Sequence, residues 1–498
     1  MQIKNRNSLN NQSQVEKWGR FEIVIQGPQI GNPFVDVRLA AKFEFGHRSI
    51  EVDGFYNGNG EYCIRFMPDK VGEWIYRTVS NVPELDSITG TVTVEEPGEG
   101  NHGPVSVSNT YHFAYADGTP FYPFGTTSYV WNHQGDQLEK QTLKSLRESG
   151  AFNKMRMCIF PKHYDYNLQE PSCYPFQGSP EAGWDFTAFD PEYWRHLEQR
   201  INDLQVLGIE IDLILFHPYD RWGFAKMDEA TDNLYLQYAV ARLSSFRGIW
   251  WSLANEYDLM RNKSMSDWDR FFRIIQESDP YQHLRSIHNW HHKMIHRRSD
   301  AHWYDHSKPW VTHVSIQHNE LAYIDDWKEI YRKPIVIDEC RYEGNIDLGW
   351  GSLSAERMVE CFWQGVAQGA YVTHGETYLH PEGIIWWSHG GTLHGNSPAR
   401  IRFLKSIMED GPQLGEVKLN FDWDTAAAGV DEKYYLVYFV DSRPAFRYLP
   451  LPDEKEFTIE IIDTWEMKIT QLPGTYSGRT RIELPGKLYQ ALRIKAVL

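Results

Sequence analysis

A regular alternation between apolar segments and amphipathic helical patterns over residues 105–415 constrains the fold of this chain most strongly. Between the apolar segments, spacings of three and four residues, as from Trp194 to Leu197 and Ile201, place large apolar side chains on one helical face. Strand–helix units repeated in this way over about 300 residues are typical of a (β/α)8 barrel. The segments that we expect to form its strands are 121–127, 152–160, 208–216, 248–255, 284–289, 312–317, 334–339 and 370–375.

An open, doubly wound sheet is the alternative α/β architecture for such an alternation. Sheets of that kind often bind nucleotides through a glycine-rich loop after the first strand. Neither GxGxxG nor GxxxxGK[ST] follows residues 121–127, which favours the closed barrel.

Period-two patterns flank the barrel on both sides. In "EYCIRF", Tyr62, Ile64 and Phe66 fall on one face of a strand, and "NGNG" just before it predicts a hairpin turn. We therefore expect an immunoglobulin-like β-sandwich before the barrel and a small β-sandwich after it. The expected divisions are a disordered lead-in at 1–14, the first sandwich at 15–98, the barrel at 99–415 and the C-terminal β-domain at 416–498.

Composition bears on the partners and the compartment. A net charge of −17 repels phosphate backbones, so we expect no nucleic acid partner. The five scattered cysteines contain no CxxC pair, which indicates neither a disulfide framework nor a zinc knuckle. No signal-like or membrane-length apolar run is present, so we expect a cytoplasmic protein with no membrane partner. The two β-domains leave surface for a homo-oligomer.

Two of the apolar strands end in carboxylates. "WWSLANE" ends at Asn255 and Glu256, and "PIVIDE" ends at Asp338 and Glu339. Active sites of such barrels lie at the C-terminal ends of the strands, and strands four and seven are nearly opposite each other around the ring. Glycoside hydrolysis needs two facing carboxyl groups, one protonated and one ionised. A single Glu at a strand end is more often an ion-pair partner or a helix cap. The prediction of a glycosidase site therefore depends on finding two such residues, Glu256 and Glu339, on strands four and seven of the same barrel.

"LANE" on strand four and "IDECRYEG" after strand seven resemble the (β/α)8 retaining glycoside hydrolases of clan A, and most closely their apiosidase-like branch. The resemblance spans the middle 300 or so residues. It implies that Glu256 is the acid/base, that Glu339 is the nucleophile of a covalent glycosyl-enzyme mechanism, and that no cofactor is needed. Arg156 matches the clan's strand-two arginine, which keeps the nucleophile ionised. Asn255 would contact the hydroxyl next to the reacting carbon.

The resemblance also extends to the flanking β-domains, which look like accessory domains of bacterial polysaccharide-degrading proteins. It implies a plant- or polysaccharide-derived oligosaccharide as substrate. For the two catalytic roles to coexist near neutral pH, Glu256 needs a raised pKa and Glu339 a low one.

The sequence departs from the clan at two strands. Many members carry a Tyr on strand six, where this chain has Gln317 and His318. Many carry a Trp at the end of strand eight, where this chain has His374 and Glu376. These changes affect the expected sugar more than the mechanism. Glu343, four residues past strand seven, is a rival nucleophile that we expect to bind substrate instead.

Polar and aromatic residues near other strand ends predict an aromatic-lined sugar pocket. The long segment at 161–184 would wall in one side and favour action at chain ends. The remaining candidate sugar contacts are Tyr129, Trp131, His217, Asp220, His288, His318, Tyr342, Glu343, Glu376 and Trp386.

Three rival functions remain open at this point. A metal-dependent barrel hydrolase usually opens with His-x-His after strand one, which is missing here, so we expect no metal; "HNWHH" at 288–292 would bind one only adventitiously. A transglycosidase would use the same two carboxylates. A non-catalytic carbohydrate-binding barrel would have lost at least one of them.

Overall fold

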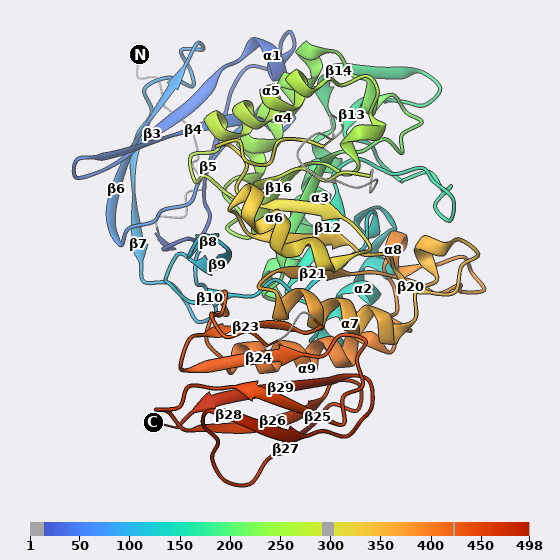
Figure 1. Cartoon of the computed structure of the whole chain (residues 1–498). Coiled ribbons are helices and arrows are strands. Elements are labelled where there is room, and N and C mark those ends of the chain that lie inside the picture. The colour runs from blue at the N-terminus through green and yellow to red at the C-terminus, as the bar shows by residue number, and fades with distance from the viewer. Residues whose placement is uncertain (1–13, 291–302, 422–423, 498) are drawn as a thin grey trace, which may run out of the picture.

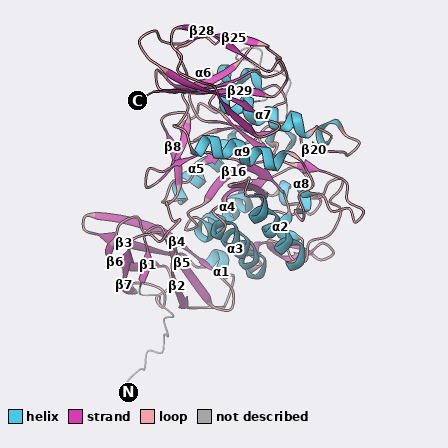
Figure 2. Ribbon diagram, turned by 90° about the horizontal axis from the view of Figure 1, so that it is seen from below, coloured by secondary structure: helices cyan, strands magenta, loops and turns pink. Residues whose placement is uncertain are grey.

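The computed structural model describes residues 14–290, 303–421 and 424–497. A (β/α)8 barrel lies in the middle, with an N-terminal β-sandwich at one end and a C-terminal β-region at the other (Figure 1). The view from below shows the same order, with the two β-regions on opposite sides of the barrel (Figure 2). The predicted lead-in at 1–14 lies outside the described residues except for Gln14, which begins the first strand. No helix in the described ranges is both long and apolar enough to cross a bilayer.

The N-terminal sandwich is one seven-stranded sheet folded over on itself. Its strand β4 pairs with β3 up to Asp53 and then changes partner to β5 from Gly54 onward. The two layers close on an apolar core in which the rings of Phe43 and Phe66 stack with centroids 3.9 Å apart. The strand order is β1 (Gln14–Glu16), β7 (Thr89–Glu95), β6 (Gly72–Ser80), β3 (Leu39–Phe45), β4 (Arg48–Tyr56), β5 (Glu61–Phe66) and β2 (Phe21–Gln26), with helix α1 (Pro33–Asp36) after β2.

A three-stranded antiparallel sheet joins the sandwich to the barrel. It consists of β8 (Val105–Ser108), β9 (His112–Tyr115) and β10 (Pro120–Phe121). The sequence predicted one continuous strand at 121–127, but Phe121 belongs to this sheet and the barrel begins only at Gly125. Pro123 lies between the two, and proline cannot donate the ladder hydrogen bond that a continuous strand requires.

The barrel prediction is confirmed. Every predicted segment contains one barrel strand, and these strands follow one another around the ring in sequence order, which the strands of a doubly wound sheet do not do. The ring closes between the fifth and sixth strands through one bridge, His288 with Ser315, and through the Thr312 amide, which donates to the Arg285 carbonyl at 2.9 Å. The strands are β11 (Gly125–Thr127), β12 (Lys154–Cys158), β15 (Glu210–Phe216), β16 (Ile249–Ala254), β17 (Arg285–Ser286), β18 (Val314–Gln317), β19 (Ile335–Glu339) and β21 (Tyr371–His374).

Helices cover the outside of the ring and short elements decorate its ends. Asp190 caps α3 by accepting from the Glu192 amide, with Pro191 at the first helical position. The helices are α2 (Asp136–Ser149), α3 (Pro191–Val206), α4 (Glu229–Leu243), α5 (Met265–Ser278), α6 (Ile324–Tyr331), α7 (Ala355–Ala367), α8 (Trp386–His389) and α9 (Ser397–Glu409). The extra strands are β13 (Phe176–Ser179), β14 (Gly183–Phe189), β20 (Glu343–Gly344) and β22 (Glu376–Thr377), and the 3-10 turns are Trp131–His133, Phe224–Lys226, Tyr257–Leu259, Leu321–Tyr323 and Gly349–Gly351.

The C-terminal region packs its larger sheet against α7 and α9 (Figure 1). Tyr438 lies over Trp363 of α7 with ring centroids 5.8 Å apart, and Arg493 pairs with Asp410 just past α9 at 3.0 Å. The larger sheet has the order β23 (Ala426–Val430), β24 (Tyr434–Tyr438), β29 (Gln490–Ala496), β26 (Phe457–Asp463) and β27 (Lys468–Gln471), and β25 (Phe446–Pro450) pairs with β28 (Arg479–Glu483).

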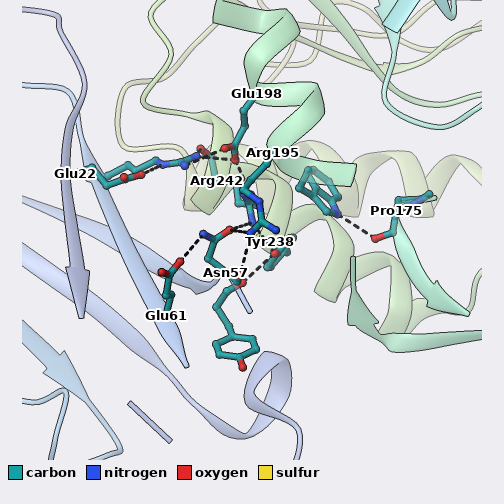
Figure 3. Close-up of polar contacts among 11 residues, drawn as sticks. Glu22, Asn57, Glu61, Pro175, Arg195, Glu198, Tyr238 and Arg242 are labelled. Carbon is teal, nitrogen blue, oxygen red and sulfur yellow. Dashed lines mark hydrogen bonds and ion pairs between the residues drawn. The ribbon is translucent and has the colours of Figure 1, made fainter. Parts of the chain in front are cut away.

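Buried charges fix the N-terminal sandwich to the barrel. Arg65 of β5 donates to both carboxylate oxygens of Glu198 in α3, at 2.7 and 2.9 Å, and Arg242 of α4 donates to the same group at 2.6 Å. Figure 3 shows Glu198 and Arg242 facing Glu22 and Asn57 of the sandwich. Burial alone would raise the pKa of Glu198, but the two guanidinium groups outweigh it and lower the pKa to about 2. The carboxylate therefore stays ionised and holds the two parts in one orientation.

Candidate active site

A cavity of about 550 Å³ opens at the C-terminal ends of the barrel strands. Aromatic rings form its walls, and carboxylates, amides and two basic groups line the rest. Its volume and mixed lining are those of a small-molecule pocket. The lining residues are Tyr129, Lys162, Tyr164, Tyr219, Asn255, Glu256, Trp290, Gln317, Asn319, Glu339, Arg341, Tyr342, Gly349, Trp350 and Trp387.

Glu256 enters the pocket from the end of β16. Its backbone has φ 50° and ψ 52°, the left-handed region that a non-glycine residue adopts only under strain. The turn ends the strand and begins a 3-10 turn, whose first amide, that of Tyr257, donates to the His288 carbonyl at 3.1 Å. The Tyr219 hydroxyl donates to one carboxylate oxygen of Glu256. The Gln317 amide nitrogen, in the orientation that satisfies its neighbours, donates to the other oxygen at 2.9 Å.

Glu339 enters the pocket from the end of β19, through a register shift. Ile337 pairs with Ile316 of β18, but the next pair joins Glu339 to Gln317, so Asp338 is an extra residue. Successive side chains of a regular strand point to opposite faces, and the bulge removes that restriction. Asp338 turns into the barrel interior and Glu339 reaches the pocket, where it accepts a hydrogen bond from the Tyr129 hydroxyl.

The two carboxyl groups perturb each other. Burial and then the charge of Glu339 raise the pKa of Glu256 to about 8, against the smaller opposing effects of Lys162 and the Tyr219 hydrogen bond. Burial raises the pKa of Glu339 as well, which differs from the low value expected from the sequence. The Tyr129 hydrogen bond and the charges of Arg156 and Lys162 oppose that rise. Two neighbouring buried carboxylates do not ionise together easily, so the pair favours a state with one proton.

A charged network fills the barrel interior beneath the pocket. Lys154 lies 2.7 Å from both Asp212 and Asp338, and Arg156 lies 3.1 Å from Asp212, with all four side chains fully buried. Arg156 also donates to the Asn255 side-chain oxygen at 3.0 Å. Arg156 therefore acts on the pocket through its charge and through Asn255, whose amide nitrogen is left to face a ligand.

Lys162 is the principal lining residue that sequence reasoning missed. Its ammonium nitrogen lies 3.8 Å from the ring centroid of Tyr129 and 4.3 Å from those of Tyr219 and Trp387, a cage of cation–π contacts. Burial lowers its pKa, and no carboxylate in the described ranges forms a salt bridge with it. Lys162 follows the end of β12 by four residues, so the strand-end argument that selected Glu256 would have selected it too.

The structure brings together five of the residues that the sequence proposed for the site, namely Tyr129, Asn255, Glu256, Glu339 and Tyr342. Sequence reasoning did not propose Tyr164, Tyr219, Trp290, Asn319, Arg341, Gly349 or Trp350. Four of them, Tyr219, Trp290, Asn319 and Arg341, lie within four residues of the end of a barrel strand. The other three lie farther along loops, where no periodic pattern marks the direction of a side chain.

Several proposed contacts lie outside the lining. The Trp131 indole donates to the Met157 sulfur, and the Trp386 indole donates to Thr126, while the neighbouring Trp387 faces the pocket. The Asp220 carboxylate accepts from the backbone amides of Trp222, Gly223 and Ala225 and so shapes its own loop. These side chains support the pocket from behind.

The proposed histidine contacts also lie outside the lining of the pocket. His217 contacts the Phe160 carbonyl at 3.2 Å, and burial lowers its pKa to about 3. The backbone amide of His288 donates to Ala254, and that of His318 donates to Glu339 at 2.9 Å. The last two residues of the 288–292 motif lie outside the described residues. Glu343 and Glu376 form a separate cluster beside the barrel end.

An eight-stranded barrel with paired carboxylates at strand ends four and seven, inside an aromatic pocket, is the arrangement of a glycoside hydrolase. Comparison with known families agrees: residues 107–446 match the family described as "Apiosidase-like, catalytic domain". Since that match covers more than half of the chain, the protein belongs to the apiosidase-like family of glycoside hydrolases. Residues 14–81 and 423–495 match two domains of unknown function, DUF5060 and DUF5605.

Solved structures support the same class. A candidate glycoside hydrolase from Bacteroides vulgatus ATCC 8482 is 41% identical, with a TM-score of 0.90 over 98% of this chain and 100% of that one. A family 5 glycoside hydrolase from the same organism shares the fold alone, at 15% identity and a TM-score of 0.60 over 79% of this chain and 93% of that one. No curated protein gives a significant sequence match.

Proposed function

We propose that the enzyme is a retaining exo-glycosidase in which Glu339 is the nucleophile and Glu256 the acid/base. The observation that carries this assignment is the asymmetry of the two carboxyl environments. Burial raises the pKa of both groups, but at Glu339 the Tyr129 and Tyr342 hydroxyls and the charges of Arg156 and Lys162 oppose that rise. At Glu256 the charge of Glu339 adds to the effect of burial and brings the pKa to about 8, so in this proposal Glu256 carries the proton at neutral pH.

The reaction follows from these protonation states in two steps. Glu339 attacks the anomeric carbon while the glycosidic C–O bond breaks and Glu256 gives its proton to the leaving oxygen. Water then attacks the same carbon, Glu256 takes the proton from that water, and the bond from the sugar to Glu339 breaks. Both steps invert the carbon, so the product keeps the configuration of the substrate.

The pocket supports a neutral or hydroxylated sugar at the end of an oligosaccharide chain. Trp350 and Trp387 offer flat faces for a sugar ring, and the Asn255 amide offers a hydrogen-bond donor beside Glu256. The segment at 161–184 contributes Lys162 and Tyr164 to one wall, which favours a pocket closed on that side and therefore action at a chain end.

Product stereochemistry tests the proposal. A screen of aryl glycosides and plant oligosaccharides identifies a substrate, and proton NMR of the first minutes of its hydrolysis records the configuration of the product before mutarotation. Retention of configuration is the expected result. An inverted product would contradict the nucleophilic role of Glu339 while leaving the class of enzyme intact.

A further inference from the structure

Beside the barrel end, two glutamates face each other on the short parallel sheet of β20 and β22. Glu343 is directly opposite Glu376 in the register of that sheet. Their exposed fractions are 0% and 1%, and neither forms an ion pair with Lys or Arg within the described ranges. Like charges in directly opposed positions destabilise a sheet, and burial without a counter-charge makes the cost larger. A bound cation, or a proton on one of the two carboxyl groups, would remove this repulsion.

His374 completes the cluster from the end of β21. Its Nε2 is fully buried with no hydrogen-bond partner and lies 3.9 Å from the nearer Glu376 oxygen. Its Nδ1 lies 3.0 Å from the Thr126 hydroxyl, and in the tautomer that donates there, Nε2 presents a lone pair to the two carboxylates. A ring nitrogen held by a hydrogen bond on its other side is the usual arrangement of a metal-binding histidine.

We propose that Glu343, His374 and Glu376 bind a divalent metal ion. One ligand atom from each lies within 4.8 Å of the others, so a small shift closes the three around an ion. One imidazole and two carboxylates suit Zn²⁺ or Mn²⁺ better than Ca²⁺ or Mg²⁺, which favour oxygen ligands alone.

The hydrogen bonds already made by the carboxylates set how they would bind the ion. The two Glu376 oxygens each accept one backbone amide, from His394 and Gly395, which leaves a lone pair on each. The Glu343 oxygens accept the Tyr378 hydroxyl, the Asn396 amide and both the amide and the hydroxyl of Ser397. Glu376 is therefore the readier ligand, and Glu343 joins when the Ser397 hydroxyl rotates away.

The bound ion would join three segments of the chain. Glu343 follows Tyr342 of the pocket, Glu376 follows the last barrel strand, and the amides at 394–397 lead into α9. None of the three ligands lines the pocket. The site is thus structural, and it stands independently of the roles proposed for Glu256 and Glu339.

Metal binding to the full-length protein tests the site. The chain is stripped with a chelator, and ZnCl₂ and MnCl₂ are titrated in separate calorimetry experiments, with thermal unfolding followed in parallel. We expect about one equivalent of one of these ions to bind and to raise the unfolding temperature. Glu376→Gln and His374→Gln should each weaken binding at least about tenfold. Glu382→Gln, on the exposed loop nearby, is the matched control and should bind as the wild type does.

Two outcomes would overturn the proposal. One is a stripped, folded wild-type protein that binds neither ion. The other is Glu376→Gln binding as tightly as wild type. If a proton shared by the two glutamates replaces the ion, thermal unfolding distinguishes that case, because burial and Glu343 raise the pKa of Glu376 to about 8. The unfolding temperature would then fall as pH rises from about 5 to 8, and neither ion would change it.

Discussion

Two groups of buried charges lie one above the other in the barrel, and they differ in their balance. In the interior network, Lys154 and Arg156 match Asp212 and Asp338 one for one. Burial would raise the pKa of Asp338, but Lys154 and Arg156 outweigh it and hold the pKa well below its usual range. In the pocket above, the charge of the caged Lys162 lowers the pKa of both Glu256 and Glu339, and that of the more distant Arg156 lowers the pKa of Glu339. These effects do not offset burial, so both carboxyl pKa values are raised.

The comparison separates two uses of burial. Matched charges in the interior network pair with one another and hold strands β12, β15 and β19 together. An unmatched pair of carboxyl groups keeps one proton that it can give away near neutral pH, which a glycosidase needs. The two groups meet at Asn255, whose side-chain oxygen accepts from Arg156 below and contacts Tyr129 above.

The largest expected effect comes from removing the nucleophile. Glu339→Ala should lower kcat by a factor on the order of 10⁴ with an unchanged unfolding temperature, because the pocket carboxylate is not part of the matched network. Sodium azide should restore part of the turnover by attacking the anomeric carbon in place of the missing group. Steady-state kinetics with and without azide measure both effects, and Glu320→Gln, on an exposed loop near the pocket, is the control.

Normal turnover of the Glu339 variant on the true substrate would assign the nucleophile elsewhere. Glu343 was the rival in sequence, but its carboxylate is engaged by donors around α9 and does not line the pocket.

The next effect compares the same substitution at two buried lysines. Lys154→Met leaves Asp212 and Asp338 with Arg156 alone and should destabilise folding by about 3–5 kcal/mol. Lys162→Met removes a cation that has no salt-bridge partner in the described ranges, and should cost much less. Urea unfolding of both variants measures the difference. An equal loss of unfolding free energy in both variants would show that the interior network and the pocket do not differ in how much they depend on a balance of charges.

A smaller effect concerns activity and the charge of Lys162. Since that charge lowers the pKa of both pocket carboxyl groups, Lys162→Met should move both limbs of the pH profile of kcat/KM toward higher pH. We also expect kcat to fall by roughly 10²-fold through weaker stabilisation of developing charge. A loss of activity with an unmoved profile would mean that Lys162 acts only by packing.

The smallest expected effect concerns the fall of kcat/KM on the alkaline side of its pH profile. Above a pH of about 8, Glu256 loses its proton and kcat/KM should fall about tenfold per pH unit. Glu256→Gln should remove this limb on an aryl glycoside whose leaving group needs no protonation. A limb that persists in that variant would belong to another group.

The sequence predicted the barrel because its strands and helices have distinct periods, and it predicted both pocket carboxylates because each ends a strand. It could not predict that Asp338 and Glu339, adjacent in the chain, both point inward, since the bulge depends on pairing with Gln317. It also placed Trp386 in the pocket instead of Trp387, because within a four-residue helix the direction of a side chain is set by tertiary contacts. Lys162 was missed although it lies only four residues past the end of β12, where the strand-end argument also applies.

The contact between Arg65, Glu198 and Arg242 has a consequence for how the enzyme is assembled. A tethered module can be cut away or exchanged without harm to its neighbour. Here the N-terminal sandwich supplies half of the positive charge around a carboxylate sealed inside the joint. The barrel expressed by itself would expose Glu198 and remove its partner Arg65, so the sandwich is a structural part of the barrel scaffold and not a detachable module.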